Sequence, residues 1–179
     1  MEQDDPIKHE FLRLLNEWRG LVELPWLFLN NKLMESAQRR ADEMERKSEI
    51  GLDSEDGKSI AQELNEAGYQ VTRWTYDVSQ GIIDAKQALS VFVEDNGSRA
   101  HLRDAFVKEA GVGFSAEGGR WAILLARRQS ECGNGLVEAE EECDVGDTFD
   151  ECCTSECKIG ESCDCYQPEN SPTTTCSHW

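Results

Sequence analysis

The chain has 179 residues and a formal net charge of −18 at neutral pH, from 18 basic and 36 acidic side chains. This length allows one ordinary domain with a hydrophobic core and one smaller unit. The acidic balance argues against nucleic acid as a partner, because phosphate binding needs clustered lysine and arginine, and no run of residues is apolar enough to form a transmembrane helix.

The first 130 residues contain four segments with the spacing of amphipathic helices. The first starts at the cap Asp5 and at Pro6, and its apolar residues recur at helical intervals until Gly20. The third starts at a capping box formed by Ser59 and Gln62. The four predicted helices cover about residues 6–20, 31–50, 59–68 and 84–95.

Three strands are predicted among these helices, at 69–74, 111–115 and 121–126, and a glycine turn joins the last two. Helices that precede and interrupt a terminal hairpin predict an α+β fold, with the helices packed on an antiparallel sheet. The tryptophans of this region are expected in its core: Trp18, Trp26, Trp74 and Trp121.

Five blocks occur here in a fixed order: LNEWRG, LPWLFLNNKLMESAQRRADEM, DSEDGKSIAQELNEAGY, GSRAHLRDAFVKEAGVGF and GGRWAILLARR. Together they resemble the CAP superfamily, which comprises the cysteine-rich secretory, antigen 5 and pathogenesis-related proteins and their bacterial relatives. The resemblance covers nearly all of residues 8–128. It implies a three-layer α-β-α sandwich and an extracellular address.

Members of that family commonly hold a divalent metal in a central cleft with two histidines and two acidic residues. The resemblance places Leu52, Tyr76 and Ser98 at three of these positions. Each replacement removes a ligand. Leucine has no atom that coordinates a metal, a tyrosine is a poor anion at neutral pH, and Ser98 stands where the family has a histidine. We therefore expect no zinc in the cleft, and we expect that Leu52→His alone does not restore a site.

His101 lies one helical turn after Ser98, so a Ser/His pair could share a helix face. The interpretation favoured by the sequence is a solvent-exposed histidine, because no acidic residue can be assigned to orient the imidazole. The segment Asn96-Gly97-Ser98 is also a glycosylation sequon, although a helix-ending turn is the preferred interpretation.

All cysteines lie in the last 48 residues, which carry 12 acidic side chains and one lysine. An even number in a short acidic segment predicts a disulfide framework of an oxidising compartment, with its pairing left open. The charged start, MEQDDPIKHE, is no secretory signal, so a signal was removed or the sequence is a fragment. The predicted disulfide cysteines are Cys132, Cys143, Cys152, Cys153, Cys157, Cys163, Cys165 and Cys176.

The segment CGNGLVEAEEECD, residues 132–144, places oxygen donors between two cysteines, and calcium takes six to eight such oxygens. It resembles short cysteine-rich repeats appended to secreted proteins of some bacteria and protists, and it also resembles the opening of disintegrin domains. The resemblance implies calcium ligation by one backbone carbonyl and four side chains: Leu136, Asn134, Glu138, Glu141 and Asp144. The alternative is that these acids only form a solvated face. Integrin binding is less well supported, because Val145 replaces a disintegrin cysteine.

Three regions are predicted: a CAP-like domain at 1–130, a disulfide-rich calcium module at 131–165, and a Pro/Thr-rich linker or tail at 166–179. The predicted function is a secreted, non-enzymatic recognition protein whose ligand is an extracellular protein or a lipid. The alternative is an extracellular hydrolase or peptidase that acts through the CAP cleft.

Overall fold

The structure is a computed structural model that describes residues 5–51, 54–129, 132–133, 135–137, 141–146 and 150–178. The chain forms two compact units, Met1–Arg128 and Gln129–Trp179, and each is described by itself. No helix in the described ranges has both the length and the apolar character needed to cross a membrane.

The first unit is built on a four-stranded sheet with the strand order β1-β3-β4-β2. Its strands are β1 (Phe28–Leu29), β2 (Val71–Ser79), β3 (Glu109–Ser115) and β4 (Arg120–Arg128). β4 pairs antiparallel with both β2 and β3, and β1 pairs parallel with β3. Because β4 is central and buried on both faces, its sequence is almost continuously apolar.

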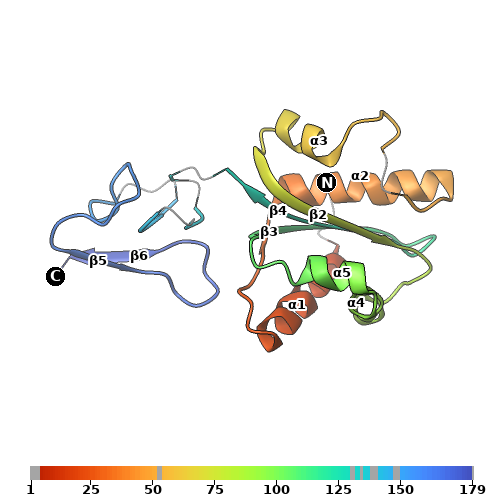
Figure 1. Ribbon diagram of the computed structural model, residues 1–179, viewed down its shortest axis with the longest axis horizontal. Coiled ribbons are helices and arrows are strands. Elements are labelled where there is room, and N and C mark those ends of the chain that lie inside the picture. Colours follow the sequence, from red (N-terminus) through yellow and green to blue (C-terminus); the bar gives the residue numbers. More distant parts are fainter. Residues whose placement is uncertain are drawn as a thin grey trace. The chain divides into compact units, whose positions relative to one another are not determined.

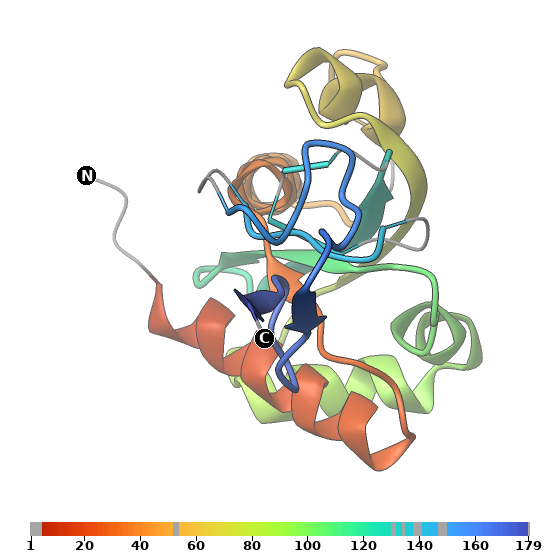
Figure 2. The ribbon, with the colours of Figure 1, turned by 90° about the vertical axis from the view of Figure 1, so that its left-hand side faces the viewer.

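Helices cover both faces of this sheet (Figure 1). α2 (Asn31–Lys47) and α3 (Ile60–Glu66) lie on one face, and α1 (Pro6–Leu21), α4 (Ala85–Glu94) and α5 (Asn96–Leu102) lie on the other. Figure 2 looks nearly along α2 and shows the sheet between α2 and α1. The predicted α+β class and the three-layer α-β-α sandwich are confirmed.

Two glycines of β3 let α2 lie directly against the sheet. A Cβ atom on Gly111 would overlap the backbone of Leu33, and one on Gly113 would overlap the carbonyl of Ala37. The apolar face of α2 is therefore buried through close backbone contact as well as through side chains.

The structure corrects three expectations for the first unit. The sheet was expected to be antiparallel, but it is mixed, because β1 pairs parallel with β3. The segment Asn96-Gly97-Ser98 was expected to be a helix-ending turn. α4 does end at Glu94, but the Asp95 side chain accepts a hydrogen bond from the Ser98 amide, 2.8 Å, so the segment begins α5. Not all the tryptophans are core residues: Trp121 is fully buried, whereas Trp26 and Trp74 are 42% and 41% exposed.

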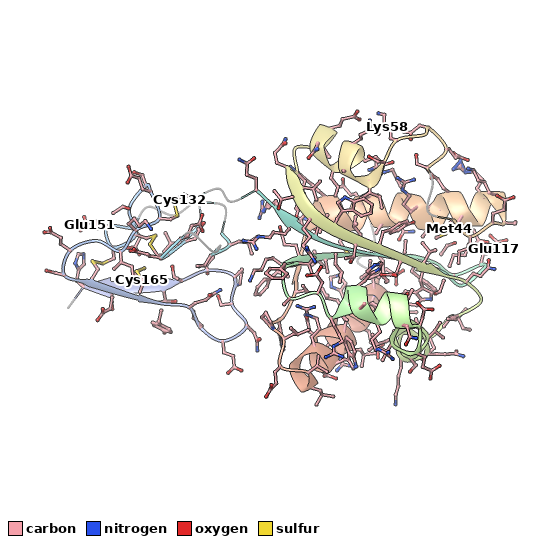
Figure 3. The ribbon with its side chains drawn as sticks, in the orientation of Figure 1. Met44, Lys58, Glu117, Cys132, Glu151 and Cys165 are labelled. Atoms are coloured by element: carbon pink, nitrogen blue, oxygen red, sulfur yellow. A yellow bond between two sulfur atoms is a disulfide. The ribbon has the colours of Figure 1, made fainter. Side chains whose placement is uncertain are left out.

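The second unit is held by four disulfides and includes all eight cysteines, as predicted (Figure 3). The bonds are Cys132–Cys157, Cys143–Cys153, Cys152–Cys163 and Cys165–Cys176. β5 (Cys163–Tyr166) pairs antiparallel with β6 (Thr175–His178). The expected linker at 166–179 therefore contains the second strand of a disulfide-closed hairpin, because Cys176 pairs back to Cys165.

Candidate functional site

A cleft with a volume of about 540 Å³ opens where the start of α3, the middle of β2 and α5 meet. Among its lining residues are Lys58, Gln62, Trp74, Tyr76 and His101. Tyr76 is one of the three positions at which the family resemblance predicts a lost metal ligand. Ser98 does not line the cleft, and Leu52 lies outside the described residues.

The Tyr76 side chain points from β2 into the layer formed by α2 and α3, and the residue is buried. Its hydroxyl has no hydrogen-bond partner among the described residues. Burial raises the pKa of the Tyr76 phenol, and the positive charge of Arg40 only partly opposes this shift. The phenol is therefore neutral at physiological pH and does not offer the anionic oxygen that a metal ion needs.

A fixed positive charge lies beside Tyr76. The Arg40 side chain on α2 is 3% exposed, and its Nη2 is 3.1 Å from Oε1 of Glu63 on α3. Glu43 lies 3.7 Å from Nη1, and the Ser36 hydroxyl donates to the other Glu63 oxygen at 3.3 Å. Arg40 therefore engages both carboxylates beside Tyr76, so that Glu43 and Glu63 are held in ion pairs within the core.

Ser98 and His101, whose pairing the sequence did not favour, are not brought together as a catalytic dyad. The amide and the hydroxyl of Ser98 both bond to the Asp95 carboxylate, and these bonds lower the pKa of Asp95. The imidazole Nδ1 of His101 instead lies 3.0 Å from each carboxylate oxygen of Asp77 on β2. Asp77 is the acidic partner that sequence reasoning could not assign.

The sequence did not point to Asp77, because the predicted strand ended at residue 74. The structure extends β2 to Ser79 and buries Asp77, and a buried carboxylate needs a partner. His101 is 24 residues away along the chain, so only the packing of α5 against β2 identifies that partner. His101 is half exposed and reaches the cleft, which places an imidazole and a carboxylate next to each other at its rim.

In the second unit, Asp144 organises the segment that resembles a disintegrin. Asp144 is fully buried, and its carboxylate accepts hydrogen bonds from the amides of Gly133 (2.9 Å), Gly135 (3.1 Å) and Gly146 (2.7 Å). All three glycines have positive φ angles, which only glycine adopts without strain. The glycines of this segment therefore let the backbone curl around one carboxylate.

Three of the five predicted calcium ligands lie in the described residues. Carboxylate oxygens of Glu141 and Asp144 lie within 4.8 Å of each other. Leu136, which precedes them in the sequence, is buried. Asn134 and Glu138 lie outside the described residues. The hydrogen bonds from three backbone amides leave the Asp144 carboxylate about one of its four lone-pair directions unused.

Two groups of the second unit include sulfur atoms near acidic or imidazole groups. The Cys157 sulfur lies with Glu141 and Asp144, and His178 lies with Cys152 and Cys163. Every one of these cysteines is in a disulfide. A metal ion binds the thiolate form, so neither group offers sulfur ligands for zinc while the disulfides are intact.

Comparison with known families identifies the family to which the first unit belongs. The sequence profile of CAP, the cysteine-rich secretory protein family, matches residues 12–126, which is more than half of the chain. The chain therefore belongs to the CAP family.

Solved structures with the same fold come from several bacteria. An extracellular protein containing an SCP domain from Bacillus anthracis has a TM-score of 0.65 at 17% identity, over 69% of this chain and 41% of that one. An outer surface protein of Borrelia burgdorferi also has a TM-score of 0.65, at 12% identity over 71% of this chain and 96% of that one. A cysteine-rich secretory protein of Staphylococcus aureus has 0.60 at 17% identity, over 72% of this chain and 40% of that one. At these identities the likeness establishes the fold alone.

Curated relatives match a smaller part of the chain. Disintegrin and metalloproteinase domain-containing protein 18 of Rattus norvegicus is 49% identical over 47 residues, or 24% of this chain. Protein 1 of the same series is 45% identical over 55 residues, or 26% of this chain. The chain spans only 11% and 7% of the lengths of these two relatives.

Proposed function

We propose that this CAP protein is a secreted, non-catalytic recognition protein whose cleft binds a ligand without a metal ion. The observation that carries the proposal is the buried Arg40–Glu63 pair beside the neutral phenol of Tyr76. Arg40 holds the Glu63 carboxylate in an ion pair and the Tyr76 phenol is neutral, so neither group offers a free anionic ligand to a metal ion. An extracellular location is supported by the four disulfides, which persist only under oxidising conditions.

The metal-free cleft is tested by zinc titration of the oxidised protein, read by calorimetry. Wild type and Tyr76→Glu are compared, since the variant places a carboxylate at the position where the family resemblance predicts one. We expect no zinc binding at the cleft in wild type. Zinc binding that is abolished by His101→Ala would overturn the proposal, because His101 is the imidazole at the rim.

We propose further that the second unit binds calcium through the segment around Asp144. The support is the approach of the Glu141 and Asp144 carboxylates and the glycine-bounded loop that holds one of them in place. The short match to the disintegrin and metalloproteinase proteins agrees with the likeness of this segment. Calcium would also relieve the repulsion between neighbouring carboxylates.

Calcium titration by calorimetry tests this module, with three variants beside the oxidised wild type. Glu141→Gln removes a predicted ligand but keeps the amide bonds of Asp144, and Glu141→Ala with Asp144→Ala removes both ligands. Glu161→Gln removes the same charge at an exposed position of the second unit and is the control. We expect binding in wild type and control, weaker binding in the single variant and none in the double. No binding by wild type would mean that the acids form only a solvated face.

A hydrolase is the second candidate, and the His101–Asp77 contact is the observation that favours it. A carboxylate that orients an imidazole can create a general base, but a hydrolase also needs a nucleophile or an activated water. The Ser98 hydroxyl is bonded to Asp95 instead. Turnover of an activated ester that His101→Ala abolishes, while the fold is retained, would establish the hydrolase and refute the non-catalytic role.

A further inference from the structure

The two edges of the sheet in the first unit differ in how their backbone groups are satisfied. In an antiparallel ladder, the N–H and C=O groups of one residue point to the same side of the strand, and those of the next residue point to the other side. On β3, the carbonyl of Ala110 accepts from the Asn30 amide at 3.1 Å, so Ala110 faces the β1 side. Three alternate residues of β3 therefore face β4, namely Glu109, Gly111 and Gly113. Their partners in β4 are Ala126, Leu124 and Ala122, in that order.

The same alternation fixes the orientation of β2. The β4 residues between those three, Leu125 and Ile123, face β2, where they pair with Thr75 and Asp77. Thr75 and Asp77 therefore direct their backbone groups into the sheet, and the residues that alternate with them direct theirs to the open edge. These edge residues are Trp74, Tyr76 and Val78.

The β3 edge is covered beyond the two residues of β1. The Gln38 side chain on α2 accepts from the Phe114 amide at 3.0 Å and donates to the Phe114 carbonyl at 2.9 Å, and the Val112 amide contacts the Met34 sulfur. The start of the β2 edge is also covered, since the Asn65 side chain accepts from the Val71 amide at 3.0 Å. For Trp74, Tyr76 and Val78, by contrast, no backbone partner exists among the described residues.

The Trp74 and Tyr76 part of this open edge lies in the cleft, whereas Val78 lies beyond its lining. Trp74, Thr75 and Tyr76 line the cleft, with Lys58 and Gln62 on the α3 side and His101 on the α5 side. An uncovered edge is normally avoided, because its free N–H and C=O groups pair readily with another strand. Here the backbone groups of Trp74 and Tyr76 lack a backbone partner among the described residues, and both residues line a groove of about 540 Å³, which is in the size range of ligand sites.

We propose that the β2 edge binds an extended peptide segment of a partner protein, which adds a strand to the sheet along Trp74–Val78. The alternation of N–H and C=O along this edge is matched by another extended main chain and not by an alkyl chain or a sterol. The walls formed by the start of α3 and by α5 admit a single strand more easily than the edge of a second folded sheet. This inference names the ligand class for the proposed recognition cleft and rests on that function.

The edge also indicates what the peptide must look like. At every second residue of the peptide, the backbone N–H has to donate a hydrogen bond to β2 and the C=O has to accept one. Proline is excluded at those positions because it has no backbone N–H. The indole of Trp74 is 41% exposed in the groove and offers a flat apolar surface to one peptide side chain. Selectivity would then depend on the side chains that face Trp74 and His101, while affinity would depend mainly on main-chain bonds.

The experiment uses linear nonapeptides selected from a phage-displayed random library on the oxidised full chain. The strongest binder is synthesised in two further forms, each N-methylated at alternate residues, so that one form loses the amides that face β2 and the other loses those that face away. We expect one form to bind at least about tenfold more weakly than the unmodified peptide, because several main-chain bonds are lost, and the other to bind like it.

Two variants of the protein test the same main-chain hydrogen bonds by changing β2 instead of the peptide. Trp74→Pro removes an outward amide at an edge position, where proline breaks no ladder bond, and Trp74→Ala removes the indole but keeps the amide. We expect the peptide to bind the proline variant at least about tenfold more weakly than the alanine variant. Val78→Pro replaces the first variant if its circular dichroism spectrum shows that it does not fold.

The outcomes separate this inference from the proposed function. If no peptide is selected, or if both methylated forms bind equally, the strand-addition inference is wrong while the metal-free recognition role stands. If the bound peptide is cleaved, as read by mass spectrometry, the non-catalytic role is wrong while strand addition stands. If sedimentation shows a dimer that is lost in Trp74→Pro and kept in Trp74→Ala, the edge belongs to a second copy and the peptide assignment is wrong.

Discussion

Arg40 on α2 and Glu63 on α3 form an ion pair of 3.1 Å in the interior of the first unit, with side chains 3% and 11% exposed. Glu63→Ala would leave the guanidinium buried next to Glu43 alone. We expect this variant to lose about 3–5 kcal/mol of stability in urea unfolding, as is usual when one partner of a buried pair is removed.

The control is the exposed pair of Arg13 and Glu17 on α1, whose atoms lie 2.6 Å apart. Glu17→Ala should cost no more than about 0.5 kcal/mol, because water screens this pair. Similar losses in Glu17→Ala and Glu63→Ala would contradict the structural role given to the buried pair.

The unpartnered hydroxyl of Tyr76 predicts that Tyr76→Phe does not destabilise the protein. The substitution keeps the ring in its packing site and removes a buried polar group that has no hydrogen bond. We expect the unfolding free energy at pH 7 to stay the same or to rise by up to about 1 kcal/mol. A clear loss of stability would show that the hydroxyl has a partner.

The raised pKa of Tyr76 predicts a loss of stability at alkaline pH. Above the unfolded pKa of about 10, the unfolded chain releases the phenolic proton while the folded chain retains it. Unfolding is then favoured, by up to about 1.4 kcal/mol per pH unit until the folded phenol also ionises. Urea unfolding between about pH 9 and 11 should show a steeper decline for wild type than for Tyr76→Phe, and parallel curves would contradict the prediction.

The close packing of α2 on β3 predicts that Gly113→Ala is destabilising. The new methyl group would overlap the Ala37 carbonyl, so the helix has to move away from the sheet. We expect a loss of about 1–3 kcal/mol or more. Gly20→Ala is the matched control, because no atom lies within 4 Å of its Cβ position on α1; it should be neutral or stabilising by up to about 1 kcal/mol, and thermal unfolding compares the two.

The bonds of Asp144 predict that Asp144→Asn loosens the second unit even without calcium. The amide group of Asn would place a donor where a carboxylate oxygen now accepts a backbone N–H. In the presence of a chelator, we expect limited proteolysis to cleave this variant faster than wild type. Asp164→Asn, which makes the same change at an exposed position of β5, should be cleaved at the wild-type rate.

Local chemistry predicted the helices well. Asp5, Ser59 and Asp84 all cap helices as their sequence context indicates, and the Ser59–Gln62 capping box is present. The strands were predicted too short, because β2 continues to Ser79 only through its pairing with β4. The two residues of β1 have no signal of their own, since a parallel pair with β3 defines them.

Long-range relationships could not be predicted. The contact between Asp77 and His101 and the pair of Arg40 and Glu63 depend on how separate elements pack. Eight cysteines allow 105 pairings, so the connectivity was beyond the sequence. The uncovered edge of β2 was equally hidden, because strand order decides which strand lies at an edge.

The order of the two units along the chain has a consequence for biosynthesis. Every helix and strand of the first unit precedes Cys132, and β4 ends at Arg128. The first unit can therefore complete its fold while it emerges from the ribosome, before any thiol is available to be oxidised or mispaired. Oxidative folding is thus confined to a segment that follows a finished domain, so an error in disulfide pairing spoils only the smaller unit.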